Sequence, residues 1–431
     1  THCKSNQLKE TMYFSFKLTP LRYLYNVLTH IASFHLNIAS LFHEKTALGV
    51  KGRRQTATIL SSKISRNDET IWFHCASLGE YEQGLPVFKV IKSMYPKHKI
   101  VLTFFSPSGY VIKKKNPITE IVTYLPLDTQ QNASEFLDIV NPQLIVFVKY
   151  EIWPNYLNEL HKRPNKTLLI SAVFRKNQHL FKPIGAWIQP FLFSFDHIFV
   201  QNQKSKTLLE SIGYRDATIS GDTRFDRVLE QLSMDNTSSY IDAFKGPNIC
   251  FVGGSTWPED DLLFIEYIKS DNSNTKYIIV PHEIRPDYIL KLKDKLHHNT
   301  VLFSEKDMFD LSKSKVLIID TIGLLSKIYF YADIAYIGGA MGNSGLHNIL
   351  EAAVFGAPII IGPKYNKFPE AVEFVNAQGV LVAPNQSAFN SLSNKLIQDH
   401  DFRLKTGQIN SALVKSNAGA VLHIMSYLNK H

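Results

Sequence analysis

Hydrophobic residues along this chain gather in short continuous runs, separated by longer stretches of mixed polarity. In the first half these runs cover residues 70–77, 99–106, 143–150, 166–173 and 196–202. Strands that are apolar on both faces are typical of a parallel sheet that is covered by helices on both sides. The stretches between the runs, such as residues 80–96 and 129–140, have the pattern of amphipathic helices. The first half is therefore predicted to be an α/β domain.

The second half repeats this pattern. Its apolar runs cover residues 248–255, 276–282, 314–320, 334–339, 357–363 and 379–384. Between the halves, residues 229–247 lose the strand pattern and end in Gly246-Pro247. We therefore predict two Rossmann-like, doubly wound domains, residues 51–235 and 236–431, that face a central cleft. Ligands are expected at the carboxyl ends of the strands.

A different pattern covers residues 23–42, which contain no Asp, Glu, Lys or Arg. The segment is long enough to approach a bilayer span, but Asn, Thr, Ser and His dilute its hydrophobicity. Cations flank it, with Arg22 before and Lys45 and Lys51 after. We expect residues 1–50 to form a membrane-associated segment whose helix lies in or dips into an anionic membrane surface. A helix packed against the first domain is the alternative.

Composition adds charge to this picture. Hydrophobic residues make up 45% and charged residues 20% of the chain, which is typical of a globular protein and not of a disordered one. The chain carries 47 Lys and Arg against 38 Asp and Glu, a net charge of +9. Such an excess suits an anionic partner, although an ordinary basic surface would also explain it. The three cysteines form no CxxC motif, which favours reduced thiols and a cytoplasmic location.

Two glycine-rich motifs follow strands of the second half. In CFVGGSTWPEDD, the hydroxyls of Ser255 and Thr256 can donate to a phosphate or a sugar. In IGGAMGNSGLHNILEAA, a loop with Gly342 and Gly345 leads into a helix predicted to begin near Leu346. Free backbone N–H groups at such a helix start form an anion site, although plain N-capped helices would give the same pattern. Neither motif has the GxxxxGK[ST] or GxGxxG spacing.

The predicted helix that follows the second loop carries two further candidates. Asn348 and Glu351 lie three residues apart, on one helix face with His347. A carboxylate at that position is suited to binding ribose hydroxyls. A first-turn acid that counters the helix dipole is the alternative for Glu351.

The first half presents carboxylates after two of its strands. Ser77, Gly79 and Glu80 follow the run 70–77, and Glu151 follows the run 143–150. A carboxylate at a strand end can accept a proton from an attacking hydroxyl, provided that desolvation raises its pKa. A helix-capping acid is the alternative. Arg224, near the domain boundary, either bridges to an anionic ligand or pairs with its acidic neighbours.

Together these motifs resemble a known family. SLGE, EIWPN, GDTRFDR, GGSTWPEDD, GLHNILEAA and NKFPEAVEFVNAQG occur in the order found in the 3-deoxy-D-manno-octulosonic acid (Kdo) transferases. These are bacterial lipopolysaccharide glycosyltransferases with the GT-B architecture. The resemblance implies an inverting transfer of Kdo from CMP-Kdo to a hydroxyl of the lipid A precursor lipid IVA. It also implies an enzyme without metal or cofactor, at the cytoplasmic face of the inner membrane and without nucleic acid as a partner.

The resemblance also assigns roles to residues. The general base falls on Glu80, and a second acid near the acceptor falls on Glu151. Acceptor or cleft contacts fall on Ser77, Gly79 and Arg224, and CMP-Kdo contacts fall on Ser255, Thr256, Gly342, Gly345, Asn348 and Glu351. Many members carry a donor-contacting arginine where this chain has His282, and Arg285 follows three residues later. The sequence leaves open which of these two makes that contact.

Two other classes of function remain open on the sequence alone. A GT-B enzyme that uses a UDP-sugar, or a nucleotide-sugar epimerase, would share the C-terminal motif. A non-catalytic protein that binds anionic lipid or nucleic acid would explain the charge. Such a protein would not require Glu80 and Glu151 at the ends of strands, nor two ligand loops.

Overall fold

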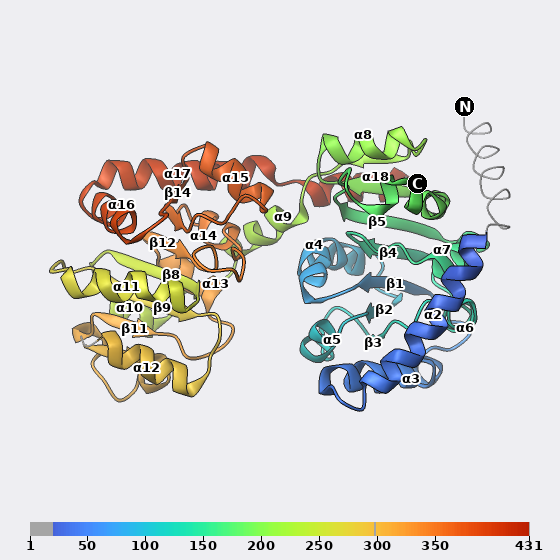
Figure 1. Cartoon of the computed structure of the whole chain (residues 1–431), viewed down its shortest axis with the longest axis horizontal. Helices are drawn as coiled ribbons and strands as arrows, with labels where there is room; N and C mark the ends of the chain where they lie inside the picture. Colours follow the sequence, from blue (N-terminus) through green and yellow to red (C-terminus); the bar gives the residue numbers. More distant parts are fainter. Residues whose placement is uncertain (1–19, 297–298, 431) are drawn as a thin grey trace. The chain divides into compact units, whose positions relative to one another are not determined.

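The computed structural model describes residues 20–296 and 299–430 and divides into two compact units. Unit 1 contains the described residues up to Arg227 together with those from Gly419 on, and unit 2 contains Val228–Ala418. Within the described residues, each unit is built on one seven-stranded sheet (Figure 1).

Unit 1 alternates strands and helices along the chain. Its elements are α2 (Pro20–Ala39), α3 (Glu44–Lys63), β1 (Thr70–Cys75), α4 (Leu78–Met94), β2 (Lys99–Phe104), α5 (Pro107–Lys113), β3 (Ile121–Tyr124), α6 (Gln130–Val140), β4 (Leu144–Val148), α7 (Pro154–Leu160), β5 (Lys166–Ala172), the 3-10 segment η2 (Pro183–Ser194), β6 (His197–Val200), α8 (Gln203–Ser211), β7 (Ala217–Ile219), α9 (Thr223–Leu229), which crosses into unit 2, and α18 (Ala420–Lys430).

The strands of unit 1 pair in parallel in the order β3-β2-β1-β4-β5-β6-β7. This is the doubly wound order, in which the chain leaves the sheet centre in one direction and returns to continue in the other. The order reverses between β1 and β4. The carboxyl ends of these two strands therefore form the switch point at which doubly wound sheets bind ligands.

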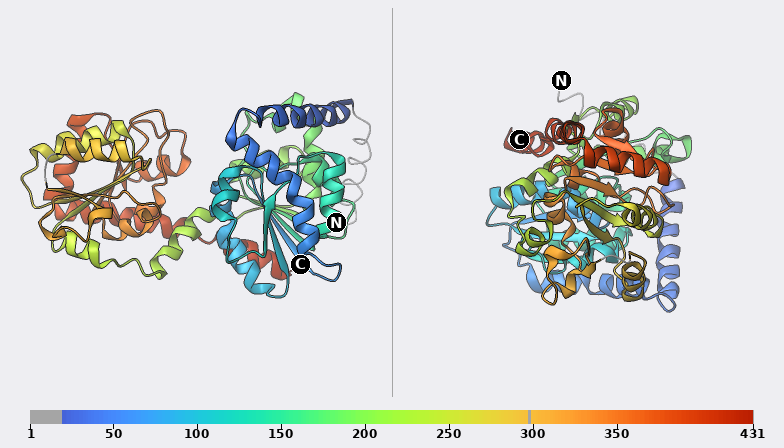
Figure 2. Two further views of the ribbon diagram at one scale, coloured as in Figure 1. Left: turned by 90° about the horizontal axis from the view of Figure 1, so that it is seen from below. Right: turned by 90° about the vertical axis from the view of Figure 1, so that its left-hand side faces the viewer.

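Helices cover both faces of this sheet because alternate strand residues point to opposite sides. Ile71 and Phe73 of β1 pack with α4 and with Ile424 of α18. Trp72 packs on the opposite face with Leu60 of α3 and with side chains of α6 and α7. Figure 2 shows α3 in blue and α18 in red on opposite sides of the sheet.

Unit 2 follows the same plan. Its elements are α10 (Ser239–Lys245), β8 (Cys250–Thr256), α11 (Pro258–Ser270), β9 (Lys276–Pro281), α12 (Pro286–Leu296), β10 (Thr300–Leu302), β11 (Val316–Ile318), α13 (Leu325–Ile328), β12 (Ile334–Ile337), α14 (Leu350–Ala353), β13 (Ile359–Ile361), α15 (Pro369–Asn376), β14 (Val380–Val382), α16 (Gln386–Gln398) and α17 (His400–Asn417).

All strand pairs of unit 2 are parallel, in the order β10-β11-β9-β8-β12-β13-β14. The order reverses between β8 and β12, so the carboxyl ends of these strands form the second switch point. Phe251 and Tyr336 pack on one face with side chains of α11, α12 and α16. The intervening residues, such as Val252 and Ala335, are fully buried as well. The prediction of two doubly wound domains is thereby confirmed.

The ends of the domains differ from the predicted ones. The sequence placed residues 419–431 in the C-terminal domain, but the structure places the helix α18 on unit 1. Ile424, Met425 and Leu428 are buried there in the same hydrophobic cluster as β1. The backbone N–H groups of Gly419 and Ala420 donate to the carboxylate of Asp226, each at 3.1 Å. The first domain therefore needs the C-terminal helix to complete the cover of its sheet.

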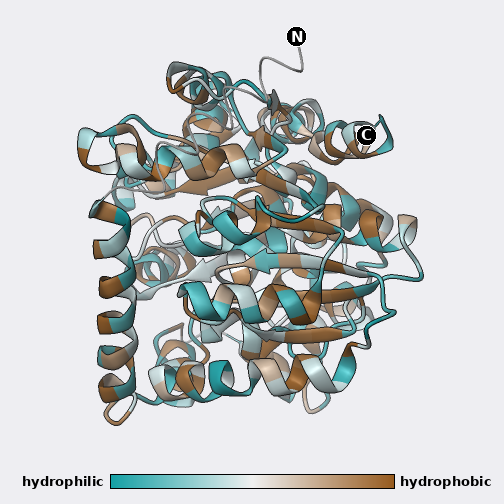
Figure 3. Cartoon of the chain, turned by 90° about the vertical axis from the view of Figure 1, so that its right-hand side faces the viewer, coloured by the Kyte–Doolittle hydropathy of each residue, from teal (hydrophilic) through white to brown (hydrophobic). Residues whose placement is uncertain are grey.

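The predicted membrane-associated segment forms α2 and the start of α3, and its first 19 residues lie outside the described residues. Tyr25 donates to Asp128 at 2.6 Å, and Asn155 donates to Asn26 at 3.0 Å, so α2 contacts unit 1 along one edge. None of the residues of α2, Pro20–Ala39, is buried. Hydrophobic residues recur along its length (Figure 3), and several of their side chains are exposed. The helix therefore packs on the domain as the alternative predicted but is not buried by it, and membrane association stays a prediction. Across the described residues, we find no helix with the length and apolarity that a membrane span requires.

Candidate functional site

The two predicted carboxylates of unit 1 lie at the carboxyl ends of the strands that form its switch point. Ser77 ends the loop after β1 and is the N-cap residue of α4, which places Glu80 in the first turn of that helix. Glu151 follows β4, three residues after its last residue. Burial raises the pKa of the Cys75 thiol, and the carboxylates of Glu80 and Glu151 raise it further. Both carboxylates therefore lie close to the carboxyl end of β1.

Glu80 is held loosely compared with Glu151. The Ser77 hydroxyl donates to a carboxylate oxygen of Glu80, and within the described chain this is the bond that its side chain makes. The side chain is half-buried. Gly79 is exposed, and a Cβ added there would meet only the Ser77 hydroxyl, at 3.8 Å. The base candidate thus lies on an open turn where an incoming hydroxyl finds room.

Glu151 is fixed by two N–H donors. The imidazole Nε2 of His74 lies 3.0 Å from Glu151 Oε2, and the indole Nε1 of Trp153 donates to the same oxygen at 2.8 Å. His74 lies directly beside Thr103 in the register of β1 and β2, and its Nδ1 is 2.8 Å from the Thr103 hydroxyl. Trp72 Nε1 donates to that hydroxyl at 2.8 Å. A carboxylate only accepts hydrogen bonds, so the proton shared between His74 Nε2 and Glu151 is donated by His74.

Strained backbone accompanies these strand ends. Lys149 after β4 has a φ of +72°, and Ser171 in β5 has a φ of +54°. In unit 2, Ser255 at the end of β8 has a φ of +51°. Non-glycine residues adopt this conformation rarely, and it clusters at functional sites where the surrounding structure enforces it. All three residues follow or end strands at or beside a switch point.

Arg224 pairs with an acidic neighbour, which was the alternative to its contact with an anionic ligand. Its Nη2 lies 2.7 Å from Asp222, and its Nε donates to the same carboxylate at 2.9 Å. Asp222 also accepts from Gln83 of α4 at 2.9 Å. Asp222 therefore links Arg224 to α4, and the role of Arg224 as an acceptor contact stays a prediction.

In unit 2, the two glycine-rich loops meet at the second switch point. Gly338 N donates to Gly254 O at 3.0 Å, and a Cβ on Gly338 would lie 2.3 Å from Ser255 O. Gly339 and Gly345 have φ values of +94° and +93°, and a Cβ on Gly339 would lie 2.1 Å from Gly345 O. Glycine is therefore required for the two loops to approach this closely.

A buried carboxylate ties the same two loops together. Asp260 is 0% exposed and accepts from Trp257 N at 2.9 Å and Gly339 N at 2.8 Å. It also accepts from the Tyr336 hydroxyl at 2.6 Å. Burial raises the pKa of Asp260, and these hydrogen bonds oppose that rise. The first loop supplies Trp257 and the second supplies Gly339, so Asp260 fixes their separation.

The predicted donor residues of the first loop differ in access. Ser255 is partly exposed at the strand end. Thr256 is only 1% exposed, so its hydroxyl is directed into the unit. The Thr256 side chain is closed to solvent in this conformation, and its contact with the donor stays a prediction.

His282 and His347 form a stack with Trp257. The ring centroids of His282 and His347 lie 4.3 Å apart, and those of Trp257 and His282 lie 4.8 Å apart. Trp257 Nε1 donates to His347 Nε2 at 3.0 Å. Burial, and then the charge of His282, lower the pKa of His347 to about 4, so His347 is neutral near pH 7. Arg285 is exposed and pairs with Glu283 at 3.1 Å.

Asn348 and Glu351 contact each other, although not as predicted. The helix α14 begins at Leu350 and not near Leu346, so Asn348 lies in the loop before it. The chain folds back instead, with His347 N donating to Gly338 O at 3.1 Å. Asn348 Nδ2 donates to Glu351 at 3.0 Å, and Ser326 donates to the other carboxylate oxygen at 2.7 Å. Because α14 has only four residues, the anion site expected from a helix dipole here rests on loop N–H groups alone.

The remaining second-loop residue, Gly342, is buried beside an acid. A Cβ on Gly342 would lie 3.0 Å from the carboxylate of Glu259, at the start of α11. A phosphate at this glycine would therefore face a negative charge. The other second-loop glycine, Gly345, has open space around it, with Phe368 as the nearest neighbour of an added Cβ, at 3.5 Å.

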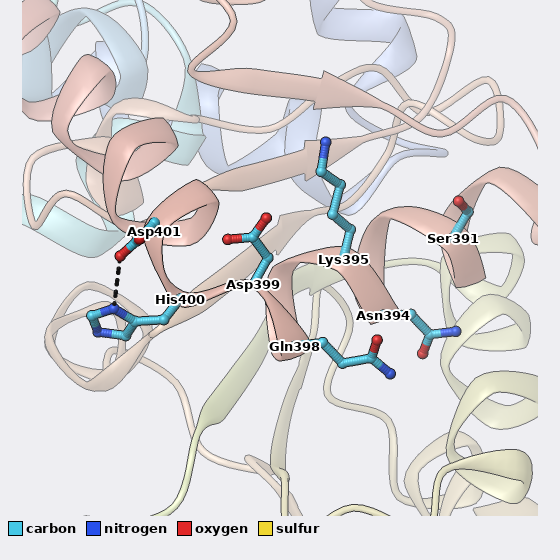
Figure 4. Close-up of a pocket in the computed structure, with 7 residues that line it drawn as sticks. All are labelled: Ser391, Asn394, Lys395, Gln398, Asp399, His400 and Asp401. Atoms are coloured by element: carbon cyan, nitrogen blue, oxygen red, sulfur yellow. Dashed lines mark ion pairs between the residues drawn. The ribbon is translucent and has the colours of Figure 1, made fainter.

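Another hollow of unit 2 lies apart from the predicted residues. It is lined by Ser391, Asn394, Lys395, Gln398, Asp399, His400 and Asp401 of α16 and α17 (Figure 4). His400 and Asp401 point toward one another at 3.5 Å, and both are exposed. These side chains surround a polar surface hollow and form no nucleophile or acid–base arrangement. Among the described residues, no three His, Cys, Asp or Glu side chains gather as metal ligands.

Several residues of these two sites were missed from the sequence. His74, Thr103 and Trp153 hold Glu151, and Asp260 holds the donor loops. His74 gave one signal, since a histidine within a fully apolar strand needs a buried partner. Asp260 gave none, because an acid in the first turn of a helix is ordinary.

Comparisons with known proteins show which family this chain resembles. The family model of the 3-deoxy-D-manno-octulosonic-acid transferase (kdotransferase) matches residues 49–227, which run from α3 to α9. The 3-deoxy-D-manno-octulosonic acid transferase of Haemophilus influenzae is 25% identical over 372 residues, covering 84% of this chain and 87% of that protein. A bifunctional glycosyltransferase/methyltransferase of Fusobacterium nucleatum is 26% identical over 332 residues, or 73% of this chain. The chain spans about half of the latter protein, 51% of its length.

A solved structure supports the fold. The UDP-GlcNAc 2-epimerase from Neisseria meningitidis matches 84% of this chain and 100% of its own, with a TM-score of 0.60 and 15% identity. At this identity the likeness concerns the fold alone, which is that of GT-B proteins. The family model over residues 49–227, the curated relatives and the order of the motifs agree in supporting a Kdo transferase.

Proposed function

We propose that this protein transfers Kdo from CMP-Kdo to a hydroxyl of the lipid A precursor lipid IVA, with inversion at the transferred carbon. The observation that carries the proposal is the pair of carboxylates, Glu80 and Glu151, at the switch point of a domain of this family. One is open and the other is held by His74 and Trp153. A non-catalytic lipid- or nucleic-acid-binding protein would not need this arrangement.

The proposed chemistry is a single displacement. The acceptor hydroxyl oxygen attacks the anomeric carbon of Kdo, and the bond from that carbon to the CMP phosphate oxygen breaks. The phosphate leaves with the electron pair of that bond, and Glu80 takes the proton of the attacking hydroxyl. Ser77 orients the Glu80 carboxylate by donating to one oxygen, which leaves the other for the acceptor. Glu151, held at Oε2, offers Oε1 as a fixed hydrogen-bond acceptor for the acceptor sugar.

The second switch point is proposed to hold the donor. Ser255 and the N–H groups of the loop around Gly345 would meet the negative charge that develops on the CMP phosphate. Glu351 and Asn348 would contact the ribose hydroxyls. His282, stacked on Trp257, is better placed for a donor contact than Arg285, which is paired with Glu283 at the surface. No step of this scheme requires Thr256, whose side chain is buried.

We further propose that the protein works at the cytoplasmic face of the inner membrane. The support is the apolar face of α2, where Leu24, Leu28 and Ile31 are 51%, 51% and 47% exposed. An amphipathic helix with such a face binds a lipid surface in the plane of the interface. Replacing these three residues by Ser should release the protein from vesicles of phosphatidylglycerol without changing its Tm. A variant that still sediments fully with the vesicles would refute this location.

The reaction is tested directly with CMP-Kdo and lipid IVA, followed by mass measurement of the lipid. The wild type should add Kdo. Glu80→Gln should keep CMP binding and lose most turnover, since an amide cannot accept the proton. Near-normal turnover of this variant would overturn the base assignment. Protection of the wild type against thermal unfolding by UDP and not by CMP would favour the UDP-sugar or epimerase alternatives.

A further inference from the structure

Unit 1 contains an apolar groove that none of the predicted site residues lines. It has a volume of about 710 Å³ and lies between α2, α3, α5 and the first turn of α4. Its lining is mainly apolar and includes Leu36, Leu48, Leu78, Phe105, Val111 and Ile112. Val111 and Ile112 are each 59% exposed, so the groove opens to the surface through apolar side chains. A soluble domain seldom leaves such a groove without an apolar ligand or partner.

The groove borders the proposed active site. Phe105 N and Ser106 N donate to Cys75 O and Ala76 O, at 3.3 and 2.7 Å, so its floor is bonded to the carboxyl end of β1. Leu78 lines the groove from the same helical turn that carries Glu80.

The second carboxylate is close to the groove as well. The ring of Phe105 packs against Trp153 at 5.0 Å, and Trp153 donates to Glu151. Glu80 therefore shares a helical turn with a groove residue, and Glu151 is linked to the groove through Trp153 and Phe105.

The surroundings of the groove are basic. The helix α3 carries five basic residues against the single acid Glu44. The exposed Lys45 lies on the groove wall, and α5 is followed by the exposed Lys114 and Lys115. Arg53 also lines the groove, with its guanidinium 4.5 Å above the Phe105 ring and bonded to Phe105 O at 2.5 Å. An apolar slot with a cationic rim is complementary to a lipid that has an anionic head group.

We propose that this groove holds an acyl chain of the acceptor lipid while the sugar hydroxyl of the same molecule lies at Glu80. This inference rests on the proposed function, because it assumes an acylated sugar phosphate as acceptor. The chain in the groove would orient the acceptor, and the phosphates would lie among the cations of the rim. Binding energy far from the reacting hydroxyl would thereby place that hydroxyl beside the base.

The test uses one groove variant and one matched control on the same helix. Thr46 lines the groove, and Thr46→Trp fills it from a helix surface. Thr58 is exposed on α3 and does not line the groove, so Thr58→Trp adds the same bulk elsewhere. Both are assayed with CMP-Kdo and two acceptors, the acylated lipid IVA and its fully deacylated disaccharide bisphosphate, at one fixed detergent concentration. Circular dichroism and Tm check folding.

The measured quantity is the ratio of kcat/KM for the acylated acceptor to that for the deacylated one. We expect the wild type and Thr58→Trp to prefer the acylated acceptor, and Thr46→Trp to lose at least tenfold of that preference. An equal ratio for all three proteins overturns the inference, as does a wild type without preference. If Thr46→Trp keeps its preference but leaves phosphatidylglycerol vesicles, the groove takes a bilayer lipid and the inference is also wrong. Failure of the wild type to use either acceptor would instead refute the proposed function.

Discussion

Asp260 offers a quantitative test of how the donor loops are held. Its carboxylate is 0% exposed and accepts three hydrogen bonds, from Trp257 N, Gly339 N and the Tyr336 hydroxyl. Asp260→Ala would leave three buried donors without a partner, each at a cost of about 1–3 kcal/mol. We therefore expect unit 2 to lose about 3–9 kcal/mol of stability, which is a large part of the roughly 5–15 kcal/mol of a typical domain.

Asp260→Asn should be far milder. Its amide oxygen can occupy the position of Oδ2 and keep the bonds to Trp257 N and Gly339 N. Its amide N–H can then donate to the Tyr336 oxygen, provided that the hydroxyl rotates. The free energy of unfolding should fall by about 1–2 kcal/mol, because only the hydrogen bond with Tyr336 is replaced by a less well aligned one. Asp261→Asn is the matched control, because Asp261 is an adjacent buried acid that accepts from Tyr288 and, within the described residues, has no bond to the second glycine-rich loop.

Urea unfolding measures the effect of these substitutions on the stability of the whole unit, and hydrogen exchange measures it for the loop alone. Exchange of the backbone N–H groups of residues 338–346 should accelerate strongly in Asp260→Ala, because the loop loses its anchor. CMP affinity, measured by calorimetry, should fall at least tenfold in the same variant and little in Asp261→Asn. If Asp260→Ala matches Asp261→Asn in stability and in loop exchange, the carboxylate does not tie the loops together.

Further predictions concern both units. His74→Phe keeps the ring volume but removes one donor to Glu151, so kcat should fall about tenfold, as expected for a charge-assisted bond of roughly 1.5 kcal/mol; an unchanged kcat would show that Glu151 does not need His74. Burial raises the pKa of Asp128 to about 6, so its stabilising contribution is present in full below about pH 4 and is lost as the pH rises through about 6. Between about pH 4 and pH 7, the free energy of unfolding measured in urea should therefore fall by about 2 kcal/mol less for Asp128→Asn than for the wild type. The same fall in both proteins would contradict this prediction. Gly338→Ala would bring a Cβ to 2.3 Å from Ser255 O and should abolish CMP protection against heat, whereas normal protection would show that the loops tolerate separation.

The positions of the two sites followed from the strand pattern because topology decides them. Apolar runs ended at Ser77 and Ser255 and just before Glu151, and the carboxyl ends of parallel strands share one edge of a sheet. The runs missed β3, β7 and β10, which are three or four residues long and carry too few hydrophobic positions to form a pattern. The predicted central cleft depends on how the two units are placed and stays a prediction.

The contacts within the sites depend on long-range register, which a single sequence does not contain. His74 reaches Thr103 because β1 and β2 pair with these two residues side by side, and it reaches Glu151 because β4 lies on the other side of β1. The helix predicted to begin near Leu346 does not form there for a related reason. Gly339 and Gly345 take left-handed conformations that fold the chain back onto Gly338, and this competes with helix formation.

The hydrogen bonds that hold Glu80 and Glu151 differ, and this difference indicates a separate role for each carboxylate in the proposed reaction. Glu151 accepts two N–H bonds at one oxygen from buried or rigid partners, so its orientation is fixed. A carboxylate fixed in this way is suited to positioning a substrate. Glu80 is bonded by the mobile hydroxyl of Ser77 on an open turn, so it can follow a hydroxyl as that group moves toward the donor. The structure therefore favours Glu80 over Glu151 as the group that takes the proton, and it gives the reason why the two acids are not interchangeable.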